Sequence, residues 1–165
     1  MLWSRLVILF VAAGMLMGCG FLPLYSSDSL TETRGELASI QVLPIENRVG
    51  QLLHNNLLDL LNSRGKPRDP KYKLDIKLSQ YTTHLGVQKN SLATRANFTL
   101  TASFTLLHSD GASILGGTNV VISSFNILES APFATSSSEK GARARAIRLM
   151  AHDIQRRLEI FFAKR

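Results

Sequence analysis

Two stretches of the chain alternate apolar and polar side chains so regularly that each predicts a β-strand with one buried face. Residues 72–78 alternate tyrosine, leucine and isoleucine with lysine and aspartate. Residues 96–106 place alanine, phenylalanine and leucine on one face, and asparagine, threonine and serine on the other. A polar connection, residues 82–92, lies between them. We expect the two strands to pair, with their apolar faces turned to the same core.

Two further stretches repeat apolar residues at helical spacing. One helix follows Asn47, a candidate N-cap, and ends at Gly65. A longer helix is predicted over residues 136–162, because Ser136 and Glu139 have the spacing of a capping box. The apolar stripe of this second helix comprises Ile147, Met150, Ala151, Ile154, Leu158 and Phe161.

The remaining elements complete a mixed fold. Residues 37–45 predict a first strand, ended by Pro44, and Asp110-Gly111 suits the turn of a hairpin. The returning strand covers about residues 115–125, where Gly116 and Gly117 would weaken or bulge its start. The predicted order is β-α-β-β-β-α. The predicted class is α+β, a two-layer sandwich in which two helices pack on a four-stranded sheet.

The N-terminal residues have the parts of a secretory signal. Arg5 precedes the uninterrupted apolar residues 6–13, and Leu16-Met17-Gly18-Cys19 resembles a bacterial lipobox. We therefore predict a lipoprotein signal peptide over residues 1–18 and lipid attachment at Cys19, with 19–35 as a lipidated tether and 36–165 as a single domain. The apolar run is shorter than the ~20 residues of a membrane-spanning helix. An uncleaved membrane anchor is the alternative.

Cysteine usage and charge agree with this interpretation. Cys19 is the only cysteine among the 165 residues, so no internal disulfide can form, and lipid attachment would consume its thiol. The chain has a formal net charge of +7, which favours anionic partners such as nucleic acid, anionic lipid or a phosphorylated glycolipid. Export argues against nucleic acid.

No catalytic constellation is evident. The four histidines fall in different predicted elements and lack metal-ligand spacing, and no glycine-rich phosphate loop or nucleophile elbow is present. We therefore expect no enzyme activity, no metal and no cofactor. The alternative is a catalytic triad that only folding would assemble.

Basic residues are the remaining candidates for binding. Lys89 lies in the connection between the two paired strands and Arg95 at the start of the second strand, where both could reach a phosphate at the tip or rim of the sheet. Two further basic sets lie on the first hairpin strand and along the last helix. For every set, simple solvation is the alternative, and the row on the last helix could instead contact a membrane surface or form a docking face for an acidic partner. The further sets are Lys71, Lys73 and Lys77, and Arg145, Arg148 and Arg156.

Four short segments stand out together: residues 19–25 (CGFLPLY), 47–51 (NRVGQ) leading into 55–57 (NNL), 72–75 (YKLD) and 131–134 (APFA). In their order and spacing they resemble the LptE family of lipopolysaccharide-assembly lipoproteins, in its alphaproteobacterial form. The resemblance implies a two-layer fold, attachment by lipid to the periplasmic face of the outer membrane, and insertion as a plug into the barrel protein LptD. It also implies lipopolysaccharide as a ligand, with Lys89 and Arg95 as candidates for binding the lipid A phosphates.

Two other functions compete with this interpretation. An auxiliary lipoprotein of another envelope lipid-transport system would share the lipobox, the size and a related shape. Its partner would be an inner-membrane transporter or a tunnel protein rather than a barrel. A lipid-anchored periplasmic enzyme would need polar side chains converging in a pocket, and the dry faces of the predicted strands carry none.

Overall fold

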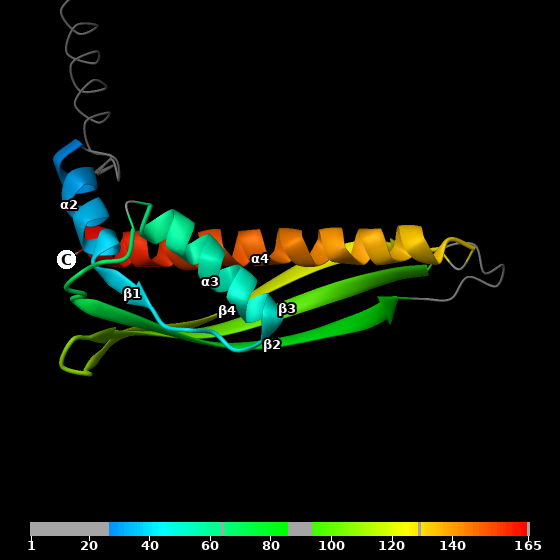
Figure 1. The fold of residues 1–165 in the computed structure, drawn as a ribbon, viewed down its shortest axis with the longest axis horizontal. Helices are drawn as coiled ribbons and strands as arrows, with labels where there is room; N and C mark the ends of the chain where they lie inside the picture. Colours follow the sequence, from blue (N-terminus) through cyan, green and yellow to red (C-terminus); the bar gives the residue numbers. More distant parts are fainter. Residues whose placement is uncertain (1–26, 64, 86–93, 129, 165) are drawn as a thin grey trace, which may run out of the picture.

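A four-stranded sheet covered on one face by helices forms the protein (Figure 1). The structure, a computed structural model, describes residues 27–63, 65–85, 94–128 and 130–164. The predicted α+β class is confirmed, with one helix more than expected. The elements in chain order are α2 (Ser27–Ala38), β1 (Ile40–Val42), α3 (Asn47–Leu61), β2 (Tyr72–Leu85), β3 (Thr94–His108), β4 (Ser113–Ile127) and α4 (Pro132–Ala163).

The strands lie in the order β1-β2-β3-β4. Short β1 runs parallel to the start of β2, whereas β2, β3 and β4 pair antiparallel along almost their whole length. The pairing of β2 with β3 is uninterrupted from Tyr72↔His108 to Leu85↔Arg95. Both strands that follow from alternation in the sequence are therefore present, and β2 extends to Leu85, into the stretch assigned to a connection.

The predicted dry face of β3 is confirmed. Its six apolar residues are at most 2% exposed, because α4 covers them along the length of the sheet (Figure 1). The helices contribute the other half of the core through their own apolar stripes. The dry face of β3 comprises Ala96, Phe98, Leu100, Ala102, Phe104 and Leu106. The fully buried part of the helix stripes includes Leu53, Leu57, Ile147, Met150, Ile154 and Leu158.

The two ends of the sheet are covered unequally. At one end β1, α2 and α3 add to α4, whereas at the other end α4 is the only described element over the sheet (Figure 1). The buried positions of β2 accordingly stop after Ile76, and most side chains from residue 79 onward are exposed. Beyond α3, the Arg143 guanidinium lies 5.3 Å from the centre of the Phe98 ring. A long amphipathic side chain thus covers part of the core that no second helix of the described ranges reaches.

Helix α2 is the element that the sequence did not predict. The sequence predicts a tether over residues 19–35 and a strand over residues 37–45, whereas residues 27–38 form α2 and the strand is reduced to β1. Leu37 is buried in the core at the end of α2. The last carbonyls of the helix are also bonded: Ser39 Oγ donates to Glu36 O (2.7 Å) and Asn62 Nδ2 donates to Ala38 O (3.0 Å). The Asn62 bond and the burial of Leu37 are contacts distant in sequence that stabilise this helix, so local periodicity does not reveal it.

The predicted starts of the other helices need correction. Asn47 is not the N-cap of α3: it is the first helical residue, with φ 68°, and Glu46 precedes the helix without a side-chain cap. Helix α4 begins at Pro132 rather than Ser136. Proline is compatible with a first helical position, since the N–H that it lacks would have no partner within the helix there. The Thr135 hydroxyl accepts from Leu128 N (2.8 Å) and lies 3.1 Å from Leu128 O, which fixes this helix start against the end of β4.

The hairpin between β3 and β4 turns at Asp110-Gly111, as predicted. Gly111 has φ 91°, a conformation that glycine adopts without steric cost. The Asp110 carboxylate accepts from Ala112 N (2.9 Å), and this hydrogen bond lowers the pKa of Asp110. The expected irregularity at Gly116 and Gly117 is instead a register shift opposite Leu106 and Leu107, and β4 already begins at Ser113.

Candidate functional site

A hollow of about 600 Å³ lies at the thinly covered end of the fold, between the start of β3, the end of β4 and the first turns of α4. Three elements meet there because α4 begins directly after β4 and runs back over it. Polar and small side chains form most of the wall, and no acidic residue lines it among the described residues. The lining comprises Arg95, Ser124, Phe125, Asn126, Phe133, Ala134, Ser137, Ser138, Gly141 and Arg145.

Two arginines give the hollow its charge. Arg95 is exposed on β3, where it pairs across the sheet with Asn126. Arg145 comes from α4, and its Nη2 donates to Ser124 O (3.1 Å). Guanidinium groups stay protonated at any physiological pH and present several donors in one plane. The arrangement can therefore bind an anionic group with oxygen acceptors.

Phe133 lies at the rim of this hollow and is 89% exposed. An aromatic ring so open to water on the first turn of α4 has no part in the core. Beside two guanidinium groups it offers apolar surface to the same ligand. The hollow therefore suits an amphiphile that carries an anionic group next to hydrocarbon.

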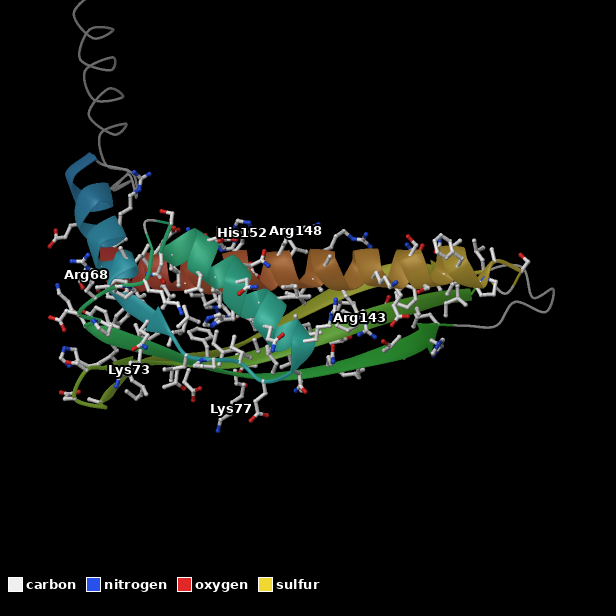
Figure 2. The ribbon with its side chains drawn as sticks, in the orientation of Figure 1. Arg68, Lys73, Lys77, Arg143, Arg148 and His152 are labelled. Atoms are coloured by element: carbon white, nitrogen blue, oxygen red, sulfur yellow. The ribbon has the colours of Figure 1, made fainter. Side chains whose placement is uncertain are left out.

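The lysines predicted on the first hairpin strand are divided between two roles. Lys73 and Lys77 are exposed on β2 and point away from the helices, as Figure 2 shows. Lys71 instead bonds through Nζ to Glu36 Oε1 at 3.0 Å, joining the start of β2 to α2. This hydrogen bond, assisted by the Glu36 charge, raises the pKa of Lys71. Only Lys73 and Lys77 thus belong to the open face of the sheet.

The basic row predicted along the last helix is divided too. Arg148 and His152 project from the outer face of α4 (Figure 2). Arg156 is paired with Asp153 at 2.6 Å, and Arg145 turns to the hollow. The row is therefore not one continuous docking face.

The histidines remain separate in the fold. His54 Nδ1 lies 3.1 Å from Leu43 O, and His108 contacts Asp110 and the Tyr72 ring. Within the described residues, no group of three or more His, Cys, Asp or Glu side chains could hold a metal ion. Across the same described ranges, no helix has both the length and the apolarity that crossing a bilayer requires.

Comparison with known proteins identifies the family. The model of the LptE family, described as lipopolysaccharide-assembly, matches residues 37–158, which include the four described strands, all of α3 and most of α4. The chain belongs to the LptE family. This membership supports a role in lipopolysaccharide assembly, and the LptE family is not known as an enzyme family.

Solved structures agree with the LptE fold. A candidate lipoprotein from Caulobacter crescentus superimposes with a TM-score of 0.66 at 24% identity, covering 80% of this chain and 96% of that one. A minor lipoprotein from Acinetobacter baumannii gives a TM-score of 0.59 at 17% identity, covering 75% and 94%. At these identities the likeness concerns the fold. A search among curated proteins returns no match.

The structure describes only part of the binding and lipidation sites predicted for this LptE-family chain. Arg95 lies in the hollow, whereas Lys89 and Cys19 fall outside the described residues, so their predicted roles remain predictions. Sequence reasoning missed Arg145 as a neighbour of Arg95. The signal that could have revealed it is the run of small residues Ala134, Ser138 and Gly141, which together with Arg145 form one stripe at helical spacing.

Proposed function

We propose that this LptE-family chain is a lipoprotein held by lipid on Cys19 at the periplasmic face of the outer membrane. There it inserts into the lumen of the barrel LptD as a plug and takes part in moving lipopolysaccharide to the outer leaflet. The observation that carries the proposal is the family match over residues 37–158. The LptD partnership, the anchor and the plug arrangement are what the family resemblance implies for this chain.

The open face of the sheet supports insertion into a polar lumen. Hydroxyl and amide side chains bond to each other across the strands, with Ser103 Oγ 3.2 Å from Thr118 Oγ1 and Ser124 Oγ donating to Asn97 Oδ1 (2.8 Å). The interior of an outer-membrane barrel is polar and can exchange hydrogen bonds with such a surface. The face away from the helices is thus suited to contact the wall of a barrel.

The hollow supports contact with the phosphates of lipid A. Arg95 and Arg145 line it from two elements, and we propose that Lys89 joins them in binding phosphate. Guanidinium groups form paired, charge-assisted hydrogen bonds with phosphate oxygens, while the exposed ring of Phe133 offers apolar surface to the adjoining acyl chains. This assignment rests on the proposed lipopolysaccharide role.

Affinity purification of the lipidated protein from detergent-solubilised envelopes tests the partner. We expect a large outer-membrane barrel at a one-to-one ratio, identified by mass. Recovery of an inner-membrane transporter without a barrel would contradict the proposal and move the protein to another lipid-transport system. A Cys19→Ser variant should be absent from the membrane fraction if Cys19 carries the anchor.

A binding titration tests the phosphate site. Arg95→Gln should weaken lipopolysaccharide binding by about tenfold, the loss expected for one charge-assisted hydrogen bond. Lys73→Gln is the matched control, because it removes one exposed charge from the open face outside the hollow. Lipopolysaccharide stripped of its lipid A phosphates should bind both variants and the parent protein alike. Equal effects of Arg95→Gln and Lys73→Gln would reject the assignment to the hollow.

A further inference from the structure

Strand β4 is an edge strand of the sheet, opposite the edge that carries β1, and two arginines of α4 reach its free edge. Arg145 Nη2 donates to Ser124 O (3.1 Å) and Arg157 Nη2 lies 3.5 Å from Thr118 O. Both carbonyls must therefore point away from β3. Backbone groups alternate sides with a period of two along a strand, and the N–H and C=O of one residue point to the same side. Val120 and Ile122, between the two bridges, consequently present their N–H and C=O groups outward.

The stretch between the arginine bridges is open. No described residue forms a hydrogen bond with the outward backbone groups of Val120 or Ile122. Their side chains are 57% and 59% exposed, on the face of the sheet away from the helices. Leu149, four residues after Arg145 on the same side of α4, is 52% exposed. An unpaired strand edge thus lies between apolar side chains, whereas such edges are usually blocked by charge, proline or a bulge.

The charges around this edge indicate which kind of strand could pair with it. Arg145 and Arg157 stand at its two ends, and Asp153, between them on the same helix ridge, is already paired with Arg156 at 2.6 Å. A second copy pairing antiparallel about a two-fold axis would bring Arg145 of one chain against Arg157 of the other. Like charges in that position oppose self-pairing. A strand with acidic residues at both ends would instead meet an arginine at each end.

We propose that the edge of β4 at residues 118–124 binds an extended segment of another polypeptide by strand addition. The segment carries small apolar side chains at alternate positions and an acidic residue at each end. Main-chain hydrogen bonds to Val120 and Ile122 supply the pairing, the apolar side chains on the open face cover Val120 and Ile122, and the acidic ends bind Arg145 and Arg157. This inference does not depend on the lipopolysaccharide role or on which protein supplies the strand.

Residue-resolved amide exchange of the full chain in detergent micelles tests the inference. The probe is a synthetic peptide of alternating threonine and valine, with glutamate at each end and the length of residues 118–124. At saturation it should slow exchange of the Val120 and Ile122 amides by about tenfold or more, as new hydrogen bonds protect them. The same peptide with lysine in place of glutamate should leave the exchange unchanged.

Two variants test whether the peptide binds at the edge of β4. Ile122→Lys should abolish the protection, since it introduces a charge beside the edge. Tyr81→Lys, at an equally exposed position on β2 of the same face, should retain the protection. The proposal fails if the peptide protects neither amide, if the lysine-ended peptide binds as well, or if Tyr81→Lys abolishes protection too. It also fails if these amides become protected at high protein concentration without peptide, because that outcome identifies a second copy as the occupant.

Discussion

At the scale of single residues, Gly50 shows how little space the packing leaves. A Cβ atom at this position would lie 2.7 Å from Ile45 Cγ2 and 2.9 Å from Ile45 O. The first turn of α3 therefore rests directly on the backbone that leads into it, a close approach made after Asn47 with its φ of 68°. Only a residue without a side chain fits between them.

Replacing Gly50 by alanine should lower the free energy of unfolding by about 1–3 kcal/mol, because the new methyl group must displace backbone at Ile45. Gly35→Ala is the matched control: nothing lies within 4 Å of its Cβ position, so better helix propensity should leave stability unchanged or raise it by up to about 1 kcal/mol. Urea denaturation measures both. A similar loss in the two variants would contradict the packing argument.

At the scale of elements, α4 combines an apolar stripe with a polar outer face along 32 residues. Leu158 of α4 is fully buried in the core, whereas Leu149 of the same helix is 52% exposed. Two leucines of one element thus occupy opposite environments. The stability of the helix on the sheet depends on the buried stripe, and the exposed positions are available for contacts with other molecules.

Leu158→Ala should destabilise the protein by about 2–5 kcal/mol, since it removes buried methyl groups and leaves a cavity. Leu149→Ala removes the same atoms from an exposed position and should change stability by less than about 0.5 kcal/mol. Thermal unfolding followed by circular dichroism separates the two. If Leu149→Ala proves the more destabilising, the exposed leucine is covered in the isolated protein.

The elements also show what a sequence pattern can predict. Strands β2 and β3 and the buried stripe of α4 follow from periodicity, because each element turns one face to water along its length. Helix α2 does not, since its end is stabilised by Asn62 and Leu37 joins a core built by later residues. The hollow shows the same limit. Arg95 is suggested by its place at a strand start, but its proximity to Arg145 depends on where α4 begins and crosses β4.

At the scale of the whole molecule, the fold is long and unevenly covered. The 15 residues of β3 span about 50 Å and the 32 residues of α4 about 48 Å, so one helix matches the full length of the sheet. Helix α3, with 15 residues, covers less than half of that length. The hollow lies in the half that α3 leaves uncovered.

This asymmetry predicts a gradient of local stability within one strand. Among the β2 amides bonded to β3, those of residues 79–85 should exchange with solvent at least about tenfold faster than those of residues 72–78, because fewer buried contacts resist their opening. Hydrogen exchange followed by NMR gives the rates. Uniform protection along β2 would mean that the sheet opens only as a unit.

The hollow and helix α2 lie at opposite ends of the long body. Helix α2, which follows the N-terminal residues, lies with the C-terminus at one end of the body, and the start of α4 beside the hollow lies at the other (Figure 1). The body between them is about 50 Å long, and a bilayer with its headgroups measures about 40–45 Å. Within the proposed assembly, a protein tethered by lipid at one membrane surface and standing upright in a barrel has the reach of a full bilayer. It would hold its arginines at the level of the opposite leaflet without detaching from its own.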